Sequence, residues 1–381
     1  MTRPLREWQA RALQAWTANG RRGIVSAVTG GGKTVLALEA IRTFPGSTSL
    51  VVVPTLALLE QWWVEIAEYF GLALDEVHII KSRGRLRRGT VNLAVLNTAA
   101  TMTQELGDCL LVVDECHKAA SPSFSAVLAL KPSATLGLSA TPERQYDDGL
   151  ETVLIPALGP VLVRYTYREA LADGVIVPFR LHNVVFELEE ETKVAYDRLT
   201  RRLARSMDAS GPDAPDTVAI MLKRARVLNM SLARVRLALR LVARNRGKRV
   251  LIFHEDIAAC DLIYQVLLDN DVLAGVYHSG LPLRSRADIL TSFRAGELDV
   301  LVTCRALDEG FNVPETEVGI IAASTATRRQ RIQRLGRVLR PSSDKQSATV
   351  YTLVATKPEI DRLREEEEEL EGVAETVWST E

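Results

Sequence analysis

The sequence has few cysteines and no long apolar run, and each absence excludes a class of protein. The chain of 381 residues contains 4 cysteines. They form neither a CxxC pair nor a mixed Cys/His set, so a zinc ribbon, an iron–sulfur cluster and a disulfide framework are not expected. No stretch approaches the roughly 18 apolar residues of a membrane span, and the charged N-terminal segment lacks an apolar signal core. We therefore expect a cytoplasmic protein with no membrane partner.

Net charge is also nearly absent, because 47 Lys and Arg face 48 Asp and Glu. This balance argues against a uniformly basic protein that coats nucleic acid, and a hydrophobic content of 47% argues against disorder. The charge is nevertheless segregated. Residues 198–249 carry 14 Lys or Arg against 3 Asp, a net of +11, and residues 359–381 carry 10 acids against 2 Arg, a net of −8.

The pattern of apolar residues predicts an α/β protein with two sheets. Short β-branched runs alternate with longer amphipathic stretches, which is typical of a parallel sheet covered by helices. The first set of runs covers residues 24–28, 50–53, 93–96, 110–113 and 135–138. The second set covers residues 250–253, 274–277, 300–303, 318–322 and 348–353.

These runs predict four segments along the chain. Residues 1–165 form a first lobe, and residues 248–357 form a second. Between them, residues 166–247 form a connector and a basic helical insert, with long helices at about 190–206 and 218–245. The insert is either a clamp over nucleic acid or a solvated helical hairpin, and the sequence leaves both open. Residues 358–381 are expected to be a solvated acidic tail.

The segment after the first apolar run has the composition of a phosphate-binding loop. The sequence AVTGGGKT at residues 27–34 follows an expected strand and opens an expected helix. Thr29, Gly30, Gly31 and Gly32 would turn backbone N–H groups toward phosphates. Lys33 would add a cation at the β- and γ-phosphates, and the Thr34 hydroxyl would ligate Mg²⁺.

A pair of carboxylates ends the apolar run at residues 110–113. Asp114 and Glu115 stand where a buried strand would meet solvent, which suits a metal and a water molecule. Asp114 would hold Mg²⁺, and Glu115 would orient and deprotonate the attacking water. Together with the loop, this pair predicts an ATPase with ATP and Mg²⁺ as its cofactors.

The order of these and later motifs resembles the superfamily 2 helicases and translocases with a DECH box, of the XPB type. The resemblance covers nearly the whole chain. It implies two tandem RecA-like P-loop lobes with parallel sheets and a helical insert between them. It also implies that ATP binds in a cleft between the lobes.

In the first lobe, the resemblance implies roles for three groups of residues. Gln9 would contact the adenine base with support from Arg6. His117, Ser139 and Thr141 would couple the ATP site to movement on the nucleic acid. The residues implied to hold the nucleic-acid backbone are Pro54, Thr55, Gln61, Asn97 and Thr98.

In the second lobe, the resemblance implies contacts to both ligands. His278 and Thr303 would contact nucleic acid, and Gly310 and Asn312 would contact the nucleotide. Gln333, Arg337 and Arg340 resemble the arginine-finger motif. The two arginines have i, i+3 spacing and so lie on one helical face, from which both would reach the γ-phosphate.

Two departures from the family pattern bear on function. Where the XPB type has an Arg-Glu-Asp element tied to strand opening, this chain reads Arg144-Gln145-Tyr146, and Asn312 stands where Asp is commoner. We therefore expect translocation or remodelling to exceed strand separation. The leading expectation is an ATP-dependent helicase or translocase on DNA rather than RNA. The alternative is a nucleotide-gated nucleic-acid clamp, or a motor subunit that recruits a nuclease or a repair or defence partner without unwinding.

Overall fold

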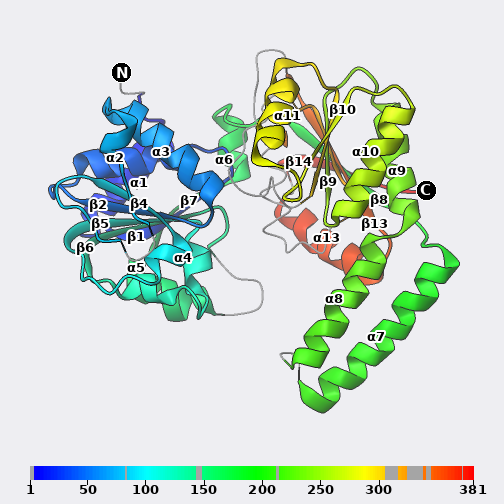
Figure 1. The fold of residues 1–381 in the computed structure, drawn as a ribbon, viewed down its shortest axis with the longest axis horizontal. Helices are drawn as coiled ribbons and strands as arrows, with labels where there is room; N and C mark the ends of the chain where they lie inside the picture. Colours follow the sequence, from blue (N-terminus) through cyan, green and yellow to red (C-terminus); the bar gives the residue numbers. More distant parts are fainter. Residues whose placement is uncertain are drawn as a thin grey trace. The chain divides into compact units, whose positions relative to one another are not determined.

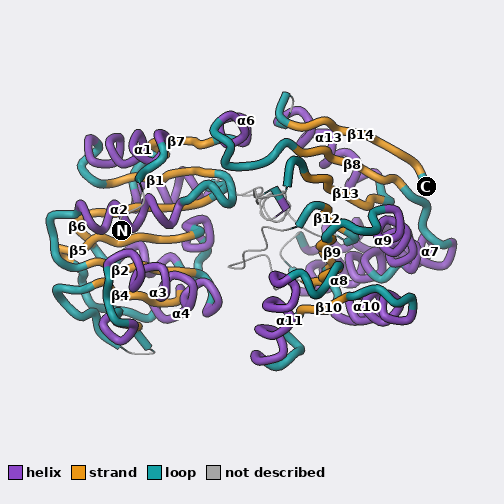
Figure 2. The backbone as a smooth tube through the Cα atoms, turned by 90° about the horizontal axis from the view of Figure 1, so that it is seen from above, coloured by secondary structure: helices purple, strands orange, loops and turns teal. Residues whose placement is uncertain are grey.

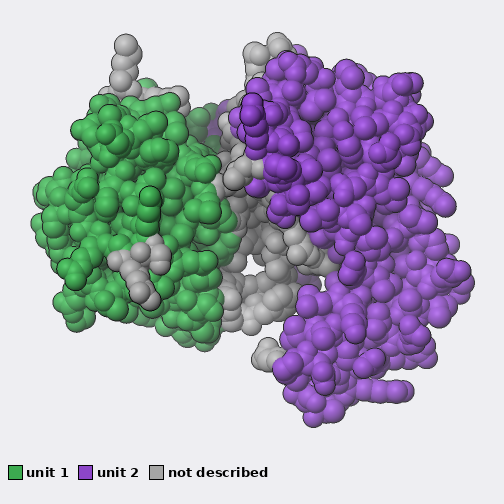
Figure 3. All heavy atoms as spheres, viewed as in Figure 1, with its two compact units in different colours: residues 1–173, 309–311 green, residues 174–308, 312–381 purple. Residues whose placement is uncertain are grey.

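The chain divides into two compact units, one up to Asp173 and one from Gly174 (Figure 3). The computed structural model describes residues 4–81, 84–142, 148–211, 214–304, 316–323, 338–339, 345–370 and 372–381. Several predicted positions lie outside these residues: Arg144, Gln145, Tyr146, Gly310, Asn312, Gln333, Arg337 and Arg340. In the described part of the chain, no helix is both long and apolar enough to cross a bilayer.

The first unit is built on a seven-stranded parallel sheet with the order β3-β4-β2-β5-β6-β1-β7. Its strands are β1 (Arg22–Ala27), β2 (Ser49–Val53), β3 (His78–Ile79), β4 (Val91–Val95), β5 (Gly107–Asp114), β6 (Pro132–Ser139) and β7 (Val161–Tyr165). Its α-helices are α1 (Glu7–Ala18), α2 (Lys33–Thr43), α3 (Leu56–Phe70), α4 (Leu96–Ala99), α5 (Ile155–Leu158) and α6 (Tyr167–Ala172). Figure 1 shows α1, α2 and α3 on one face of this sheet and α5 on the other.

The strands in the middle of this sheet are buried on both faces. All five residues of β2 are buried, and the four residues of the apolar run at 110–113 are at most 1% exposed. A sheet covered on both faces needs continuous rather than alternating apolar residues, because neither face meets water. The five predicted runs of this half fall on β1, β2, β4, β5 and β6, and only the edge strands β3 and β7 have no counterpart among them.

The second unit repeats the design, with a seven-stranded parallel sheet in the order β10-β11-β9-β12-β13-β8-β14. Its strands are β8 (Phe179–Val185), β9 (Val250–His254), β10 (Ala274–Tyr277), β11 (Val300–Cys304), β12 (Val318–Ile321), β13 (Ala348–Val354) and β14 (Ala374–Thr380). The helices described around it are α7 (Glu190–Ser210), α8 (Pro215–Asn229), α9 (Leu232–Arg244), α10 (Ile257–Asp269), α11 (Leu283–Ala295) and α13 (Lys357–Glu369). The predicted fold class of two parallel α/β lobes is confirmed.

The structure differs from the predicted domain limits at the start of the second lobe. Strand β8 lies inside the segment expected to be a connector, yet it pairs with β13 on one side and β14 on the other. The second unit therefore takes its first strand from before the helical insert. In β8, Arg180, His182 and Asn183 interrupt the apolar residues, so this strand lacks the continuous apolar run by which β9 to β13 were identified.

The segment expected to be a solvated acidic tail is part of the second sheet and its helical cover. Residues 357–369 form α13, and β14 pairs along its whole length with β8. Glu359 and Glu366 are buried. The prediction failed because the many acidic residues suggested a solvated tail. The segment is instead an amphipathic helix with a buried face at Leu363, followed by a short strand.

The basic insert consists of a hairpin and a separate helix. Helices α7 and α8 lie side by side and extend away from the second sheet (Figure 1). The predicted long helix at 218–245 is broken at Met230 and Ser231, and α9 returns to the core, where Leu237, Ala238 and Leu241 are buried. Four arginines of the insert, which would contact nucleic acid if the insert is a clamp, are all exposed on α7: Arg198, Arg201, Arg202 and Arg205.

Candidate active site

The phosphate-binding loop links the end of β1 to the start of α2, as predicted. Gly30 and Gly32 have φ values of 83° and 99°, a left-handed conformation that side chains rarely adopt. A Cβ atom at Gly32 would also lie 2.7 Å from Nε2 of Gln9. The loop therefore needs glycine at position 32 for two independent reasons, its backbone conformation and its close contact with α1.

Arg6 and Gln9 support this loop. The Arg6 guanidinium donates to the Gly31 carbonyl oxygen at 2.9 Å, and the Gln9 amide donates to the Gly32 carbonyl oxygen at 2.9 Å. Gln9 also accepts from the backbone N–H of Arg6 at 2.8 Å. Trp8, between them in sequence, stacks on Tyr165 of β7 with ring centroids 4.5 Å apart. The residues predicted to read the base thus hold the loop itself, a role that sequence reasoning missed.

Two polar groups of the loop suit a bound phosphate. The Lys33 ammonium donates to the Ala27 carbonyl oxygen at 2.8 Å, which keeps the cation at the mouth of the loop. The Thr29 hydroxyl is buried and has no hydrogen-bond partner among the described residues. A buried hydroxyl without a partner is costly, and a phosphate oxygen would satisfy it. Thr34 lies in the first turn of α2 and is half-buried. The residues present therefore fit a nucleotide.

Asp114 is the last residue of β5, and two donors hold its carboxylate. Nε1 of Trp62 donates to Oδ2 at 2.9 Å, and the backbone N–H of Glu115 donates to Oδ1 at 3.0 Å. Burial raises the pKa of Asp114, while the Trp62 hydrogen bond and the Lys33 charge act in the opposite direction. The site thus contains a half-buried carboxylate whose charged form is favoured by a few specific neighbours.

Glu115 starts a chain of polar contacts that ends at Thr141. Its φ of 48° turns the backbone sharply after β5. Nδ1 of His117 lies 3.4 Å from Oε2 of Glu115 and 3.0 Å from the Ser139 hydroxyl. That hydroxyl accepts from the Thr141 backbone N–H at 3.1 Å. The three residues predicted to couple the site to movement, His117, Ser139 and Thr141, are therefore in direct contact beside Glu115.

A metal held by protein side chains alone is not indicated. In the parts of the chain that the structure describes, no three His, Cys, Asp or Glu side chains are grouped to hold an ion. Mg²⁺ is usually bound by one or two protein groups together with phosphate oxygens and water. Asp114 and Thr34 could supply these groups, and Mg²⁺ would neutralise charge on the phosphates.

The residues predicted to hold nucleic acid in the first unit lie at the carboxyl edge of its sheet. Pro54 and Thr55 follow β2, and the Thr55 hydroxyl caps α3 by accepting from the Leu58 N–H at 3.4 Å. Asn97, which is exposed, and Thr98 lie on α4 directly after β4. Because β2 and β4 are neighbours, these groups share one edge, and Figure 2 shows α3 and α4 beside these strands. Gln61 instead donates to Glu65 at 2.6 Å.

In the second unit, the two residues predicted to contact nucleic acid, Thr303 and His278, are buried. Thr303 is 1% exposed, and its hydroxyl donates to the Ile252 carbonyl oxygen of the neighbouring strand at 3.2 Å. His278 is 5% exposed and contacts Asp261 and the Gly280 N–H through its two ring nitrogens. Both side chains are buried, and their polar atoms bond to β9, to Asp261 of α10 and to the loop after β10. The contact of Thr303 with nucleic acid stays a prediction, and the structure shows its hydroxyl bonded to the neighbouring strand.

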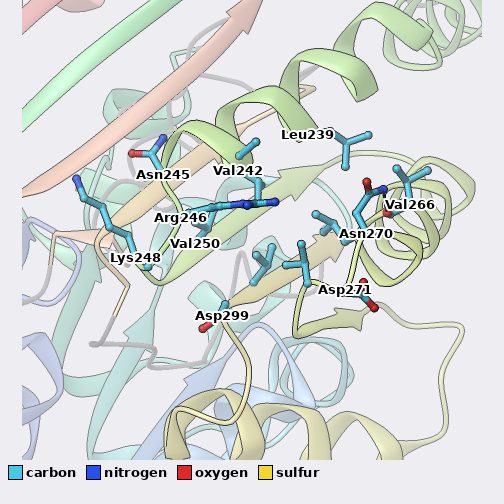
Figure 4. A pocket seen from close by; sticks show the side chains of 15 residues that line it. Leu239, Val242, Asn245, Arg246, Lys248, Val250, Val266, Asn270, Asp271 and Asp299 are labelled. Atoms are coloured by element: carbon cyan, nitrogen blue, oxygen red, sulfur yellow. Dashed lines mark hydrogen bonds between the residues drawn. The ribbon is translucent and has the colours of Figure 1, made fainter.

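Two hollows mark opposite edges of the second sheet. One of about 600 Å³ lies at the amino ends of β9 and β11, between α9 and α10, with Arg246, Lys248 and Asp299 on its polar side (Figure 4). None of the predicted site residues lines it. The other, of about 830 Å³, lies at the carboxyl ends of β10 and β11 and includes Ser279 and Cys304, with Leu222 and Arg226 of α8. Ligands of open α/β sheets bind at the carboxyl edge, so the second hollow is the better candidate for a ligand site.

Comparison with known families agrees with this geometry. Residues 2–144 match the family described as the res subunit of type III restriction enzymes, and residues 233–342 match the helicase conserved C-terminal domain. The first match includes the loop, Asp114 and Ser139. The second spans the sheet from β9 to β12.

Two curated relatives cover nearly the whole chain. A protein named DNA 3'-5' translocase XPB2, from Sulfurisphaera tokodaii, is 29% identical over 91% of this chain. A protein named DNA 3'-5' helicase XPB, from Kineococcus radiotolerans, is 28% identical over 92% of this chain. The chain spans 80% of the length of the first relative and 60% of the length of the second.

Solved structures support the fold. Dbp5 of S. cerevisiae, bound to RNA and ADP BeF3, aligns with a TM-score of 0.64 at 14% identity, covering 98% of this chain and 89% of that one. The ATP-dependent type ISP restriction-modification enzyme LlaBIII, bound to DNA, aligns with a TM-score of 0.62 at 12% identity, covering 93% of this chain and 28% of that one. The solved structures show the fold, and the two family matches with the two XPB-named relatives support a superfamily 2 helicase or translocase of the XPB type, which couples ATP hydrolysis to action on nucleic acid.

Proposed function

We propose that this chain is an ATP-driven motor that moves along DNA in the 3'-to-5' direction and remodels it, with little strand separation of its own. The observation that carries the proposal is that the loop, the acidic pair and the coupling residues gather in the first unit, where the Lys33 charge acts on Asp114. The phosphate loop, Asp114 and the contacts from Glu115 to Thr141 form one site. The direction and the DNA substrate follow the names of the relatives.

Each residue of the site has a task in this proposal. The loop amides and Lys33 bind the phosphates, and the loop is held in place by Arg6 and Gln9. Asp114 and Thr34 hold Mg²⁺. Glu115 takes the proton of the attacking water, and His117 lies within 3.4 Å of the Glu115 carboxylate to respond to that change. The predicted roles of Gln333, Arg337 and Arg340 at the γ-phosphate remain part of this proposal.

A protein partner is proposed to choose the substrate. A nuclease or a repair or defence factor would fit. The second candidate function is a nucleotide-gated clamp, which the exposed arginines of α7 favour.

The proposal is tested by substitution of the two residues that would act at the γ-phosphate. Lys33→Ala and Glu115→Gln should each lower DNA-stimulated ATP turnover by about 100-fold or more, because each removes a charge or a base needed in the transition state. Lys131→Ala is the matched control, since Lys131 is an exposed lysine of the same unit paired with Glu105. Turnover near the wild-type rate in either site variant would refute the assignment.

A further inference from the structure

Trp62 joins two parts of the first unit to which the sequence assigned separate tasks. It lies on α3, whose first turn follows Pro54 and Thr55, the residues predicted to hold nucleic acid. Its side chain is 1% exposed, and its indole N–H donates to Oδ2 of Asp114 at 2.9 Å. The helix that follows the predicted nucleic-acid residues therefore contacts the carboxylate that would bind Mg²⁺.

The sheet explains why this contact forms. Strand β2 pairs with β5 in a register that sets Val52 opposite Val113. The start of α3 and Asp114 consequently lie at the same edge. Trp62 is seven residues beyond the helix cap Thr55, about 10 Å along the axis. A continuous helix of 15 residues is stiff over that distance, so a displacement of its first turn would displace the indole as well.

Other tryptophans of this unit use their indole N–H groups differently. Trp16 donates to the Thr135 carbonyl oxygen at 2.8 Å, and Trp63 donates to the Leu74 carbonyl oxygen at 2.7 Å. A backbone carbonyl is enough to satisfy a buried indole. Trp62 instead donates to a side-chain carboxylate, Oδ2 of Asp114. With the Glu115 N–H on Oδ1, each oxygen of Asp114 has one donor, and the plane of the carboxylate is fixed.

We propose that Trp62 is a positioning residue that orients Asp114 for Mg²⁺ and passes movement of the nucleic-acid end of α3 to that carboxylate. This inference rests on the proposed function, because it takes Asp114 as the Mg²⁺ ligand. Trp62 follows Gln61, one of the residues predicted to hold nucleic acid, and the sequence analysis gave it no part in the ATP site. The available signal was its place among Leu58, Leu59 and Ile66 on the buried face of α3, where an indole N–H requires an acceptor.

The test is Trp62→Phe, which keeps an aromatic ring in the packed site and removes the N–H donor. The Mg²⁺ concentration for half-maximal ATP turnover should rise about 10-fold, the effect of losing one hydrogen bond to a charged group. Stimulation by single-stranded DNA should fall more than the basal rate does. Nucleotide binding measured without Mg²⁺ should stay at the wild-type level, which a general loss of structure would not allow.

Trp16→Phe and Trp63→Phe are the controls, since each removes an indole bond to a backbone carbonyl. They should leave the Mg²⁺ dependence unchanged. An unchanged Mg²⁺ dependence in Trp62→Phe would overturn the inference, whereas absence of DNA-stimulated turnover in the wild type would overturn the proposed function itself.

A second measurement needs no variant of the site. The chain has 5 tryptophans, so the indole N–H signals of the ¹⁵N-labelled protein are few enough to assign. The Trp62 signal should shift when Mg²⁺ with ADP is added, and again when a single-stranded oligonucleotide is added, while the Trp16 signal stays in place. A Trp62 signal that responds to neither addition would contradict the inference.

Discussion

At the residue scale, the loop depends on side chains that lie far from it in sequence. The glycines and Lys33 were recognisable because their spacing is specific to phosphate binding. That Arg6 and Gln9 donate to loop carbonyls could not be predicted, because it depends on how α1 packs beside β7, through the Trp8–Tyr165 stack. Sequence motifs identify which residues matter more readily than what they touch.

Replacement of Gln9 distinguishes loop support from base reading. Gln9→Ala removes the donor to the Gly32 carbonyl oxygen, so ATP affinity should fall about 5- to 10-fold, the usual effect of one hydrogen bond. If Gln9 acts through the loop, GTP affinity should fall by the same factor. Titration of ATP and of GTP into the wild type and into Gln9→Ala measures both affinities. A loss confined to ATP would show that the base contact dominates.

The buried His254 at the end of β9 makes stability depend on pH. Burial lowers its pKa to about 4, so the folded chain keeps it neutral while the unfolded chain protonates near the ordinary value of about 6.5. Protons therefore bind the unfolded state first, and stability is lost as pH falls from about 6.5 toward 4. Because of this residue, the free energy of unfolding at pH 5 should be about 2 kcal/mol lower than at pH 7.5.

Urea unfolding at pH 7.5 and pH 5.0 tests this value. His254→Asn keeps an acceptor for the Asp256 N–H, which His254 bonds at 3.0 Å, but does not titrate. From pH 7.5 to pH 5.0, the free energy of unfolding of the variant should fall by about 2 kcal/mol less than that of the wild type. An equal loss in the two proteins would show that His254 is not the group responsible.

At the element scale, continuous apolar strands were predictable, and the elements that broke this rule were missed. Strand β8, helix α13 and strand β14 carry polar or acidic residues, yet they complete the second sheet. The fully buried Arg234 of α9 binds Glu359 of α13 at 2.6 Å and donates to the Ala322 and Leu353 carbonyl oxygens. A buried carboxylate such as that of Glu359 is tolerated in the fold only when its charged partner is in place. A count of charges along the sequence does not show which residues form such a pair.

The α7–α8 hairpin carries the prediction that separates a clamp from a solvated connector. Changing Arg198, Arg201, Arg202 and Arg205 to Gln should flatten the dependence of DNA affinity on salt, because fewer counterions are released when fewer phosphates are contacted. The slope of log affinity against log salt should fall by about 1 or more. Binding measured by fluorescence anisotropy between 50 and 200 mM salt, about a 4-fold range, resolves this change.

The control for this experiment removes charge from a neighbouring helix. Arg236, Arg240 and Arg244 are exposed on α9, and their change to Gln should leave the slope closer to the wild-type value. If the α7 substitutions leave the salt dependence of DNA affinity unchanged, the hairpin is a solvated connector and not a clamp.

At the scale of the whole molecule, the small net charge concealed a strongly segregated distribution. The basic segment at 198–249 supplies α7, α8 and α9, and the acidic segment at 359–381 supplies α13 and β14 of the same unit. Part of this opposition is internal: Arg234 pairs with Glu359, and Arg240 and Arg244 lie against Glu381. The arginines of α7 remain exposed. Because other arginines of the segment are paired with acids, fewer positive charges face solvent than the net charge of +11 suggested.

The central claim is that ATP hydrolysis drives movement along DNA more readily than strand separation. The most direct measurement follows ATP turnover and displacement of a triplex-forming strand from duplex DNA, beside unwinding of a forked duplex. The account predicts turnover stimulated by DNA, ATP-dependent triplex displacement that Glu115→Gln abolishes, and little unwinding of the fork. ATP turnover indifferent to DNA, or fork unwinding as fast as triplex displacement, would contradict it.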